Sequence, residues 1–169
     1  MKILGIDPAL TVTGYGLIDS RGGKVHLIEA GVIKTSPDNL LSQRLEKVYR
    51  SILKLIDETR PDVMVLEKLY VHYRHPTTAY LLGEVRGVIC LISAHKNIPL
   101  FEYAATRVKK AVIGGGLASK ARLQRMVGDI LNINKLPKYT DVTDALALAI
   151  AHSYIAKVRQ VLPQEYKGR

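Results

Sequence analysis

The sequence predicts a single α/β domain built on a five-stranded mixed sheet, whose first three strands form an antiparallel meander, with helices on both faces. Three strand patterns come first and are joined by short connections, which favours antiparallel neighbours. Two further buried strand patterns then alternate with long amphipathic helices, which indicates a mixed sheet covered by helices.

The predicted meander occupies the start of the chain. Residues 3–6 form a short apolar strand, residues 14–19 a second strand and residues 24–34 a third. Arg21-Gly22-Gly23 supplies the turn between the second and third strands, because glycine adopts positive φ at little cost.

Long helices and buried strands alternate in the middle of the chain. A helix is predicted after Pro37-Asp38-Asn39, where apolar residues recur at helical spacing until Pro61. A second helix is predicted over residues 76–96. Buried strands are predicted at residues 62–66 and 99–103, before and after this second helix.

Three helices follow the last strand. The first covers residues 105–112 and ends at Gly114–Gly116, and Ser119 is a suitable N-cap for the next helix. The glycine run lacks the Lys-Ser/Thr ending of a nucleotide-binding loop. The final helix is predicted to begin near Asp141.

The charge of the chain points to a polyanionic partner. The 169 residues include 25 Lys and Arg against 15 Asp and Glu, a formal net charge of +10. No acid stands between Glu102 and Asp129, although six basic residues do. Such a stretch inside a folded domain favours phosphate contacts with nucleic acid. We expect the domain to span residues 1–156, with residues 157–169 as a basic, flexible tail.

Composition also sets the expected compartment. Cys90 is the only cysteine, which excludes intramolecular disulfides and favours an intracellular, cytoplasmic protein. Because it lies in an apolar stretch, Cys90 is predicted to be a small core residue. No apolar run reaches the length expected of a membrane span, no signal-peptide pattern opens the chain, and no membrane partner is predicted.

Four acidic residues stand where predicted strands or helices begin or end. Asp7 and Glu67 close apolar strands, whereas Asp141 and Asp144 open the final helix and share one of its faces. Each could have an ordinary role at a turn, a strand end or a helix N-terminus. Together, in a basic chain, they favour a site for Mg²⁺ or Mn²⁺, which prefer oxygen ligands. Two such ions can activate a water and hold the leaving oxygen in phosphoryl transfer.

The motifs that carry these acids resemble the RuvC-type Holliday-junction resolvases of the RNase H-like superfamily. The resemblance extends from Met1 to about Ala156. The matching motifs are Gly5-Ile6-Asp7-Pro8, Thr13-Gly14-Tyr15-Gly16, Leu66-Glu67, Phe101-Glu102-Tyr103-Ala104-Ala105, Val108-Lys109, the glycine run before Lys120, and Asp141-Val142-Thr143-Asp144-Ala145-Leu146-Ala147. One departure is Ala9, where many relatives have glycine, and it puts the shape of the loop after Asp7 in doubt.

The resemblance implies an RNase H-like fold and a crossover junction endodeoxyribonuclease acting in homologous recombination and DNA repair. Asp7, Glu67, Asp141 and Asp144 would be both the catalytic and the metal-binding residues, with two Mg²⁺ ions per site, which Mn²⁺ could replace. Two strands of a four-way junction would be hydrolysed symmetrically, leaving 5′-phosphate and 3′-hydroxyl ends.

Six residues are candidates for DNA contacts. Lys109 and Lys120 match basic positions of the family near the scissile phosphate, and Tyr70 matches an aromatic at the junction centre. Arg74 stands beside Tyr70 among aromatics and cations that suit stacking and backbone contacts. Arg107 and Arg122 belong to the acid-free stretch and are weaker candidates.

The resemblance also implies a homodimer, because a two-fold junction requires two active sites related by two-fold symmetry. Gly83 and Gly87, four residues apart on one face of the second long helix, would let another backbone approach closely. Four-way junction DNA is the expected substrate, and the branch-migration complex RuvA–RuvB is a further candidate partner.

Three other functions stay open at this point. One is an RNase H-like nuclease acting on RNA–DNA hybrids or structured RNA. Another is an actin-like or sugar-kinase-like ATPase, against which Ala9 and the small size of the chain argue. The last is a DNA-binding module without catalysis, which four matched acids disfavour because bare carboxylates repel phosphate.

Overall fold

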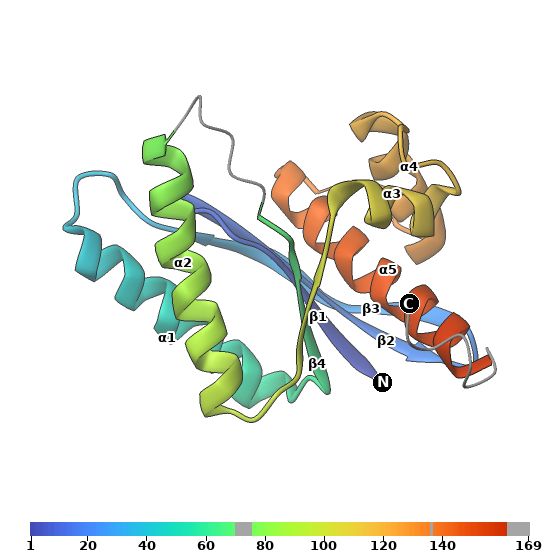
Figure 1. Ribbon diagram of the computed structural model, residues 1–169, viewed down its shortest axis with the longest axis horizontal. Coiled ribbons are helices and arrows are strands. Elements are labelled where there is room, and N and C mark those ends of the chain that lie inside the picture. The colour runs from blue at the N-terminus through green and yellow to red at the C-terminus, as the bar shows by residue number, and fades with distance from the viewer. Residues whose placement is uncertain (70–75, 136, 162–169) are drawn as a thin grey trace.

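The computed structural model describes residues 1–69, 76–135 and 137–161. Its strands and helices follow the predicted order (Figure 1). They are β1 (Lys2–Asp7), β2 (Val12–Arg21), β3 (Lys24–Lys34), α1 (Leu41–Thr59), β4 (Val63–Glu67), α2 (Pro76–His95), β5 (Leu100–Tyr103), α3 (Ala105–Ile113), α4 (Lys120–Leu131) and α5 (Thr140–Val161).

The five strands form one sheet in the order β3-β2-β1-β4-β5. β1, β2 and β3 pair antiparallel, whereas β4 and β5 join parallel to β1, which confirms the predicted mixed sheet. Ile6 of β1 pairs with Leu66 of β4. Because these two strands run in the same direction, their last residues, Asp7 and Glu67, lie side by side at one edge of the sheet.

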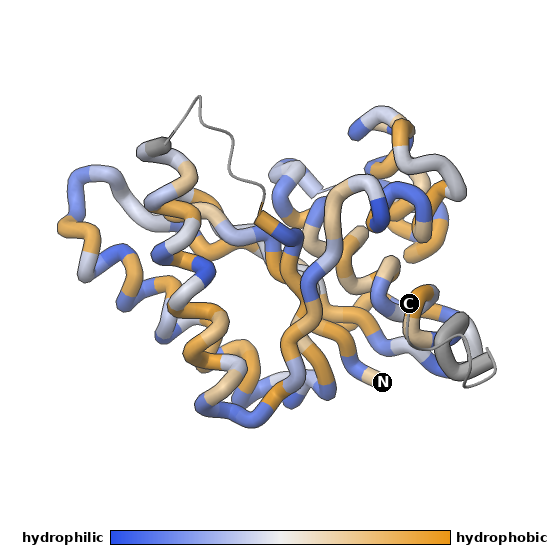
Figure 2. The backbone as a smooth tube through the Cα atoms, in the orientation of Figure 1, coloured by the Kyte–Doolittle hydropathy of each residue, from blue (hydrophilic) through white to orange (hydrophobic). Residues whose placement is uncertain are grey.

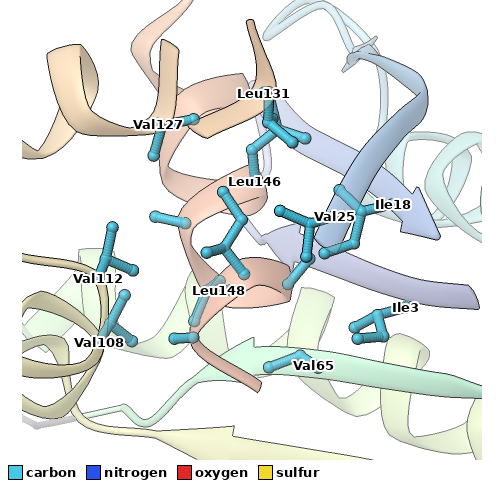
Figure 3. Packing of buried hydrophobic residues seen from close by; sticks show 14 of the residues in the cluster. Ile3, Ile18, Val25, Val65, Val108, Val112, Val127, Leu131, Leu146 and Leu148 are labelled. Atoms are coloured by element: carbon cyan, nitrogen blue, oxygen red, sulfur yellow. The ribbon is translucent and has the colours of Figure 1, made fainter. Parts of the chain in front are cut away.

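The strands bury both of their faces because successive side chains point to opposite sides. Leu4, Ile6 and Met64 face α1 and α2, whereas Ile3 and Val65 face α3, α4 and α5. Hydrophobic residues are concentrated in these central strands (Figure 2). On the second face, the fully buried Leu146 of α5 fills the space between the sheet and the helices α3 and α4 (Figure 3).

Glycines on β1 and β2 determine how closely α5 approaches the sheet. Gly5 pairs with Gly16, and Gly14 pairs with Asp7. A Cβ on Gly5 would overlap the backbone of Ala145, and one on Gly14 would lie 2.8 Å from the Cβ of Asp141 and closer still to its carbonyl group. Only glycine leaves room for the helix backbone at these positions, so α5 rests directly on the strands.

Helix α2 differs from expectation in two respects. Residues Thr77–His95 are long and apolar enough to cross a membrane by length and composition, with a mean hydropathy of 1.3, although no such segment was expected. A single helix of this kind is weak evidence for a span, and Val85, Ile89 and Ile92 of α2 are packed against the sheet. Cys90 is exposed, so its prediction as a core residue is wrong. Cys90 is exposed beside Leu91, so α2 carries apolar residues on its outer side as well as on the side packed against the sheet.

The final helix continues past the predicted domain boundary. α5 ends at Val161, five residues beyond residue 156, and the boundary therefore falls inside a helix. Residues 162–169, most of the predicted tail, lie outside the described residues.

We predict that Gly14→Ala lowers the free energy of unfolding by ~2 kcal/mol or more, because α5 must move away from β2 to relieve the overlap. Gly115→Ala is the matched control, since a Cβ there meets no described atom within 4 Å and the backbone has no positive φ. Urea denaturation of the three proteins measures the difference. Equal stability of Gly14→Ala and wild type would contradict the close packing of α5.

Candidate active site

Two of the four predicted acids stand at the ends of adjacent parallel strands. Asp7 is the last residue of β1 and Glu67 is the last residue of β4. Both side chains are partly buried. The parallel pairing of β1 with β4 therefore places two carboxylates together at one edge of the sheet.

The other two acids come from the first turns of α5. Asp141 and Asp144 are three residues apart on one face of the helix, and both are partly buried. The backbone of Asp141 packs against Gly14, which is the strand partner of Asp7. Because α5 packs directly against these glycines, its N-terminus lies next to the ends of β1 and β4.

The pKa of Asp7 is raised by its burial and by the other three acids. Burial is the main cause that raises the pKa of Asp7 to about 7, and the charges of Asp144, Asp141 and Glu67 add to it in that order. Lys120 acts in the opposite direction. All four predicted acids therefore share one electrostatic site, in which a negative charge on Asp7 is costly without a cation.

The carboxyl group of Glu67 is also partly buried among acids, but more cations lie near it than near Asp7. Burial and then Asp144 raise the pKa of its carboxyl group, whereas Lys120, Lys109 and Arg86 lower it. The two lysines that the sequence singled out, Lys109 and Lys120, are thus close enough to influence this carboxylate.

Lys120 makes the most direct contact with the acids. Its Nζ lies 2.6 Å from Oδ2 of Asp144, and this hydrogen bond is the main cause that raises the pKa of Lys120. The side chain of Lys120 is 57% exposed, whereas that of Asp144 is 20% exposed. The side chain of Lys120 is therefore open to solvent while its ammonium group is bound to the cluster.

Arg86 supports the site from behind, and sequence reasoning missed it. This buried side chain of α2 donates hydrogen bonds to the backbone carbonyl of Glu67 and to the carboxylate of Glu102 on β5. It thereby ties the end of β4 to α2 and β5. The sequence did contain a sign of this role, because Arg86 stands among apolar residues of a predicted helix. A cation buried there requires an acidic partner. That partner is Glu102, which the sequence matched only as part of a family motif.

A cleft opens in front of Asp7 and Glu67. Its volume is ≈ 440 Å³, and its wall includes Pro8, Leu82, Arg86 and Ala105. The cleft is therefore bounded by the ends of β1 and β4 and by α2 and α3.

The donor set fits a hard divalent cation. All four side chains offer carboxylate oxygens, and their mutual repulsion on Asp7 would be relieved by positive charge. Among the described residues, no three Asp, Glu, His or Cys side chains lie together in an arrangement that could hold a metal ion by themselves. An open arrangement suits Mg²⁺, which keeps several waters and uses substrate phosphate oxygens alongside one or two carboxylates.

Two of the other four predicted DNA contacts lie on α3 and α4. Arg107 on α3 lies over the ring of Tyr103, with its Cζ 5.4 Å from the ring centroid, and Arg122 on α4 is exposed. Tyr70 and Arg74 lie outside the described residues. The roles of all four in DNA binding stay predictions.

The chain is similar to known proteins over nearly its whole length. Residues 3–152 match the profile of the family described as crossover junction endodeoxyribonuclease RuvC. The protein of that name from Moorella thermoacetica is 39% identical over 169 residues, covering 100% of both chains. The one from Natranaerobius thermophilus is 38% identical over 159 residues, covering 94% of this chain and 98% of the relative.

Solved structures agree with this relationship. Thermus thermophilus RuvC in complex with a Holliday junction substrate has a TM-score of 0.89 and 30% identity, and the match covers 94% of this chain and 96% of that chain. The yeast mitochondrial Holliday junction resolvase shares the fold, with a TM-score of 0.65 and 12% identity, covering 94% and 80% of the two chains. The chain belongs to the RuvC family of crossover junction endodeoxyribonucleases, DNA nucleases of recombination with an RNase H-like fold.

Proposed function

We propose that this nuclease resolves four-way DNA junctions by hydrolysing two strands symmetrically, leaving 5′-phosphate and 3′-hydroxyl ends. The observation that carries the proposal is the gathering of Asp7, Glu67, Asp141 and Asp144 at one edge of the sheet, beneath Lys120. The solved complex of the Thermus thermophilus relative with a Holliday junction supports the choice of substrate over RNA–DNA hybrids.

Asp7, Glu67, Asp141 and Asp144 would hold two Mg²⁺ ions, which Mn²⁺ could replace. When bound, such ions activate water and stabilise the charge on the leaving oxygen in phosphodiester hydrolysis. RuvC nucleases are metal-dependent. In this chain, a bound divalent cation would lower the raised pKa of Asp7, because positive charge stabilises the ionised carboxylate.

Two lysines add positive charge to the site. Lys120 and Lys109 place positive charge beside the carboxylates, where a DNA phosphate would otherwise be repelled. The ion pair with Asp144 holds the Lys120 ammonium beside the carboxylates, where it would contact a phosphate that binds to them. Arg86 fixes the backbone at Glu67, so the carboxylate of Glu67 is positioned before DNA binds.

We infer that two copies assemble through the outer side of α2. Tyr80 and Leu91 of this helix are 65% and 63% exposed, and Gly83 and Gly87 are open to an approaching backbone within the described structure. An apolar, glycine-containing helix face of this kind suits close packing against its own two-fold copy. Two active sites related in this way would cut a two-fold junction symmetrically. The proposed setting is the cytoplasm, with the RuvA–RuvB branch-migration complex as a further partner.

The metal-site assignment predicts the effect of neutralising single carboxylates. Asp7→Asn and Asp144→Asn should each lower Mg²⁺-dependent cleavage of a mobile four-way junction by at least about 100-fold, because each removes a metal ligand rather than a supporting group. Junction binding should stay within about threefold of wild type, since phosphate contacts dominate affinity. Asp129→Asn, at an exposed acid of α4, is the matched control.

Cleavage is measured by mapping cuts on all four strands, with linear duplex and RNA–DNA hybrid as competing substrates. Wild-type cutting rates in both variants would show that the metal site is assigned to the wrong residues. Preferred cutting of the hybrid by the wild type would instead overturn the proposed substrate.

The dimer proposal predicts the behaviour of a charged substitution on α2. Leu91→Asp should convert the protein to a monomer at micromolar concentration, because two desolvated carboxylates would face each other across the two-fold axis. Leu40→Asp is the control, since Leu40 is similarly exposed, at 69%, before α1. Light scattering with and without junction DNA measures the mass, and a strictly monomeric wild type in both conditions would reject the dimer.

A further inference from the structure

An apolar side chain projects fully into solvent next to the basic part of the site. Leu117 is 98% exposed, the highest value among the large hydrophobic residues in the described part of the chain. It follows the glycine run between α3 and α4, within the stretch that carries cations but no acids. A fully exposed leucine contributes nothing to the core, and its apolar surface cannot serve a phosphate.

The backbone holds Leu117 in a defined turn. The amide of Ala118 donates to the carbonyl of Gly115 at 3.2 Å, so Gly116 and Leu117 are the central residues of a hydrogen-bonded turn. Gly116 fits closely against α3, because a Cβ there would lie 3.1 Å from the carbonyl oxygen of Thr106. On the other side, the Ser119 hydroxyl caps α4 by accepting from the amide of Arg122. Contacts with both helices therefore present the leucine at the tip of the loop.

The turn lies within reach of DNA that occupies the active site. Leu117 precedes Lys120 by three residues, so their Cα atoms are at most about 11 Å apart. Lys120 itself contacts Asp144. DNA whose scissile phosphate lay against the carboxylates and Lys120 would therefore have this turn close to the nucleotides beside that phosphate.

We propose that Leu117 is a positioning residue that inserts between neighbouring bases beside the scissile phosphate and separates them. The flat faces of the bases are the apolar surface that this part of a DNA molecule offers, and leucine is among the side chains that act as wedges at base steps. Unstacking at this step would open the backbone so that its phosphate can settle against the acids. The inference rests on the proposed function, because it requires junction DNA to cross Lys120.

Fluorescence of 2-aminopurine tests the insertion directly, because the emission of this adenine analogue rises when it is unstacked. The analogue is placed in turn on each side of the mapped cut in a four-way junction. Fluorescence and cleavage are then followed in the same stopped-flow reaction with Mg²⁺. Wild type should show a rise at one position next to the cut, and the rise should precede cleavage.

Three variants separate insertion from ordinary binding. Leu117→Ala should lose most of the fluorescence rise and cut about tenfold more slowly, while the dissociation constant of the junction changes no more than about twofold. Leu117→Met should restore both signals, since methionine can also serve as a wedge. Leu40→Ala, at an exposed leucine before α1, should behave as wild type.

Several results would overturn the proposal. It is wrong if Leu117→Ala keeps the full fluorescence rise, or if it loses the rise only in proportion to weakened binding. A wild type that cuts junctions without any rise beside the cut also contradicts it. A wild type that does not cut junctions at all would instead overturn the proposed function, so the two failures are distinguishable.

Discussion

The position of the site depends on the contact between α5 and the glycine-lined face of β1 and β2. At Gly5 and Gly14 the helix backbone occupies space that any other residue would fill. This contact brings Asp141 against the strand partner of Asp7 and aligns the start of α5 with the ends of β1 and β4. The parallel pairing of β1 with β4 supplies Glu67 at the same edge. Two sheet pairings and one helix contact thus gather acids that are distant in sequence.

Gathering these acids creates an electrostatic problem that the surrounding cations only partly solve. Lys120 balances Asp144 from the solvent side, and Arg86 supports the backbone of Glu67 from within the fold. Lys120 offsets only part of the effect on Asp7, whose pKa is still raised to about 7, chiefly by its burial. A buried carboxylate that is costly to ionise alone is well suited to bind a divalent cation together with a phosphate. The same charge arrangement that makes ionisation of Asp7 costly would therefore favour a divalent cation at the site.

Much of this could be predicted from sequence, because Asp7 and Glu67 end apolar strands, and Asp141 and Asp144 begin a helix. These positions at strand and helix ends can be recognised from the local sequence. The resemblance to the family then predicted that the four acids come together in one site. Arg86 was missed because its partner Glu102 comes from another element, and only the fold brings the two into contact. Cys90 was misplaced because α2 carries apolar residues on its exposed side as well as on the side packed against the sheet, so an apolar neighbourhood in the sequence does not establish burial.

Asp7 shares one charge cluster with three other acids, and we propose that a divalent cation completes this cluster. An NMR titration of the Asp7 side-chain carboxyl carbon, recorded with and without Mg²⁺, tests this most directly. We predict a pKa of about 7 in the metal-free protein, because burial and three neighbouring carboxylates oppose ionisation. Addition of Mg²⁺ should lower that pKa below its ordinary value. A metal-free pKa near the ordinary value of 3.8, or a raised pKa that Mg²⁺ leaves unchanged, would contradict the account.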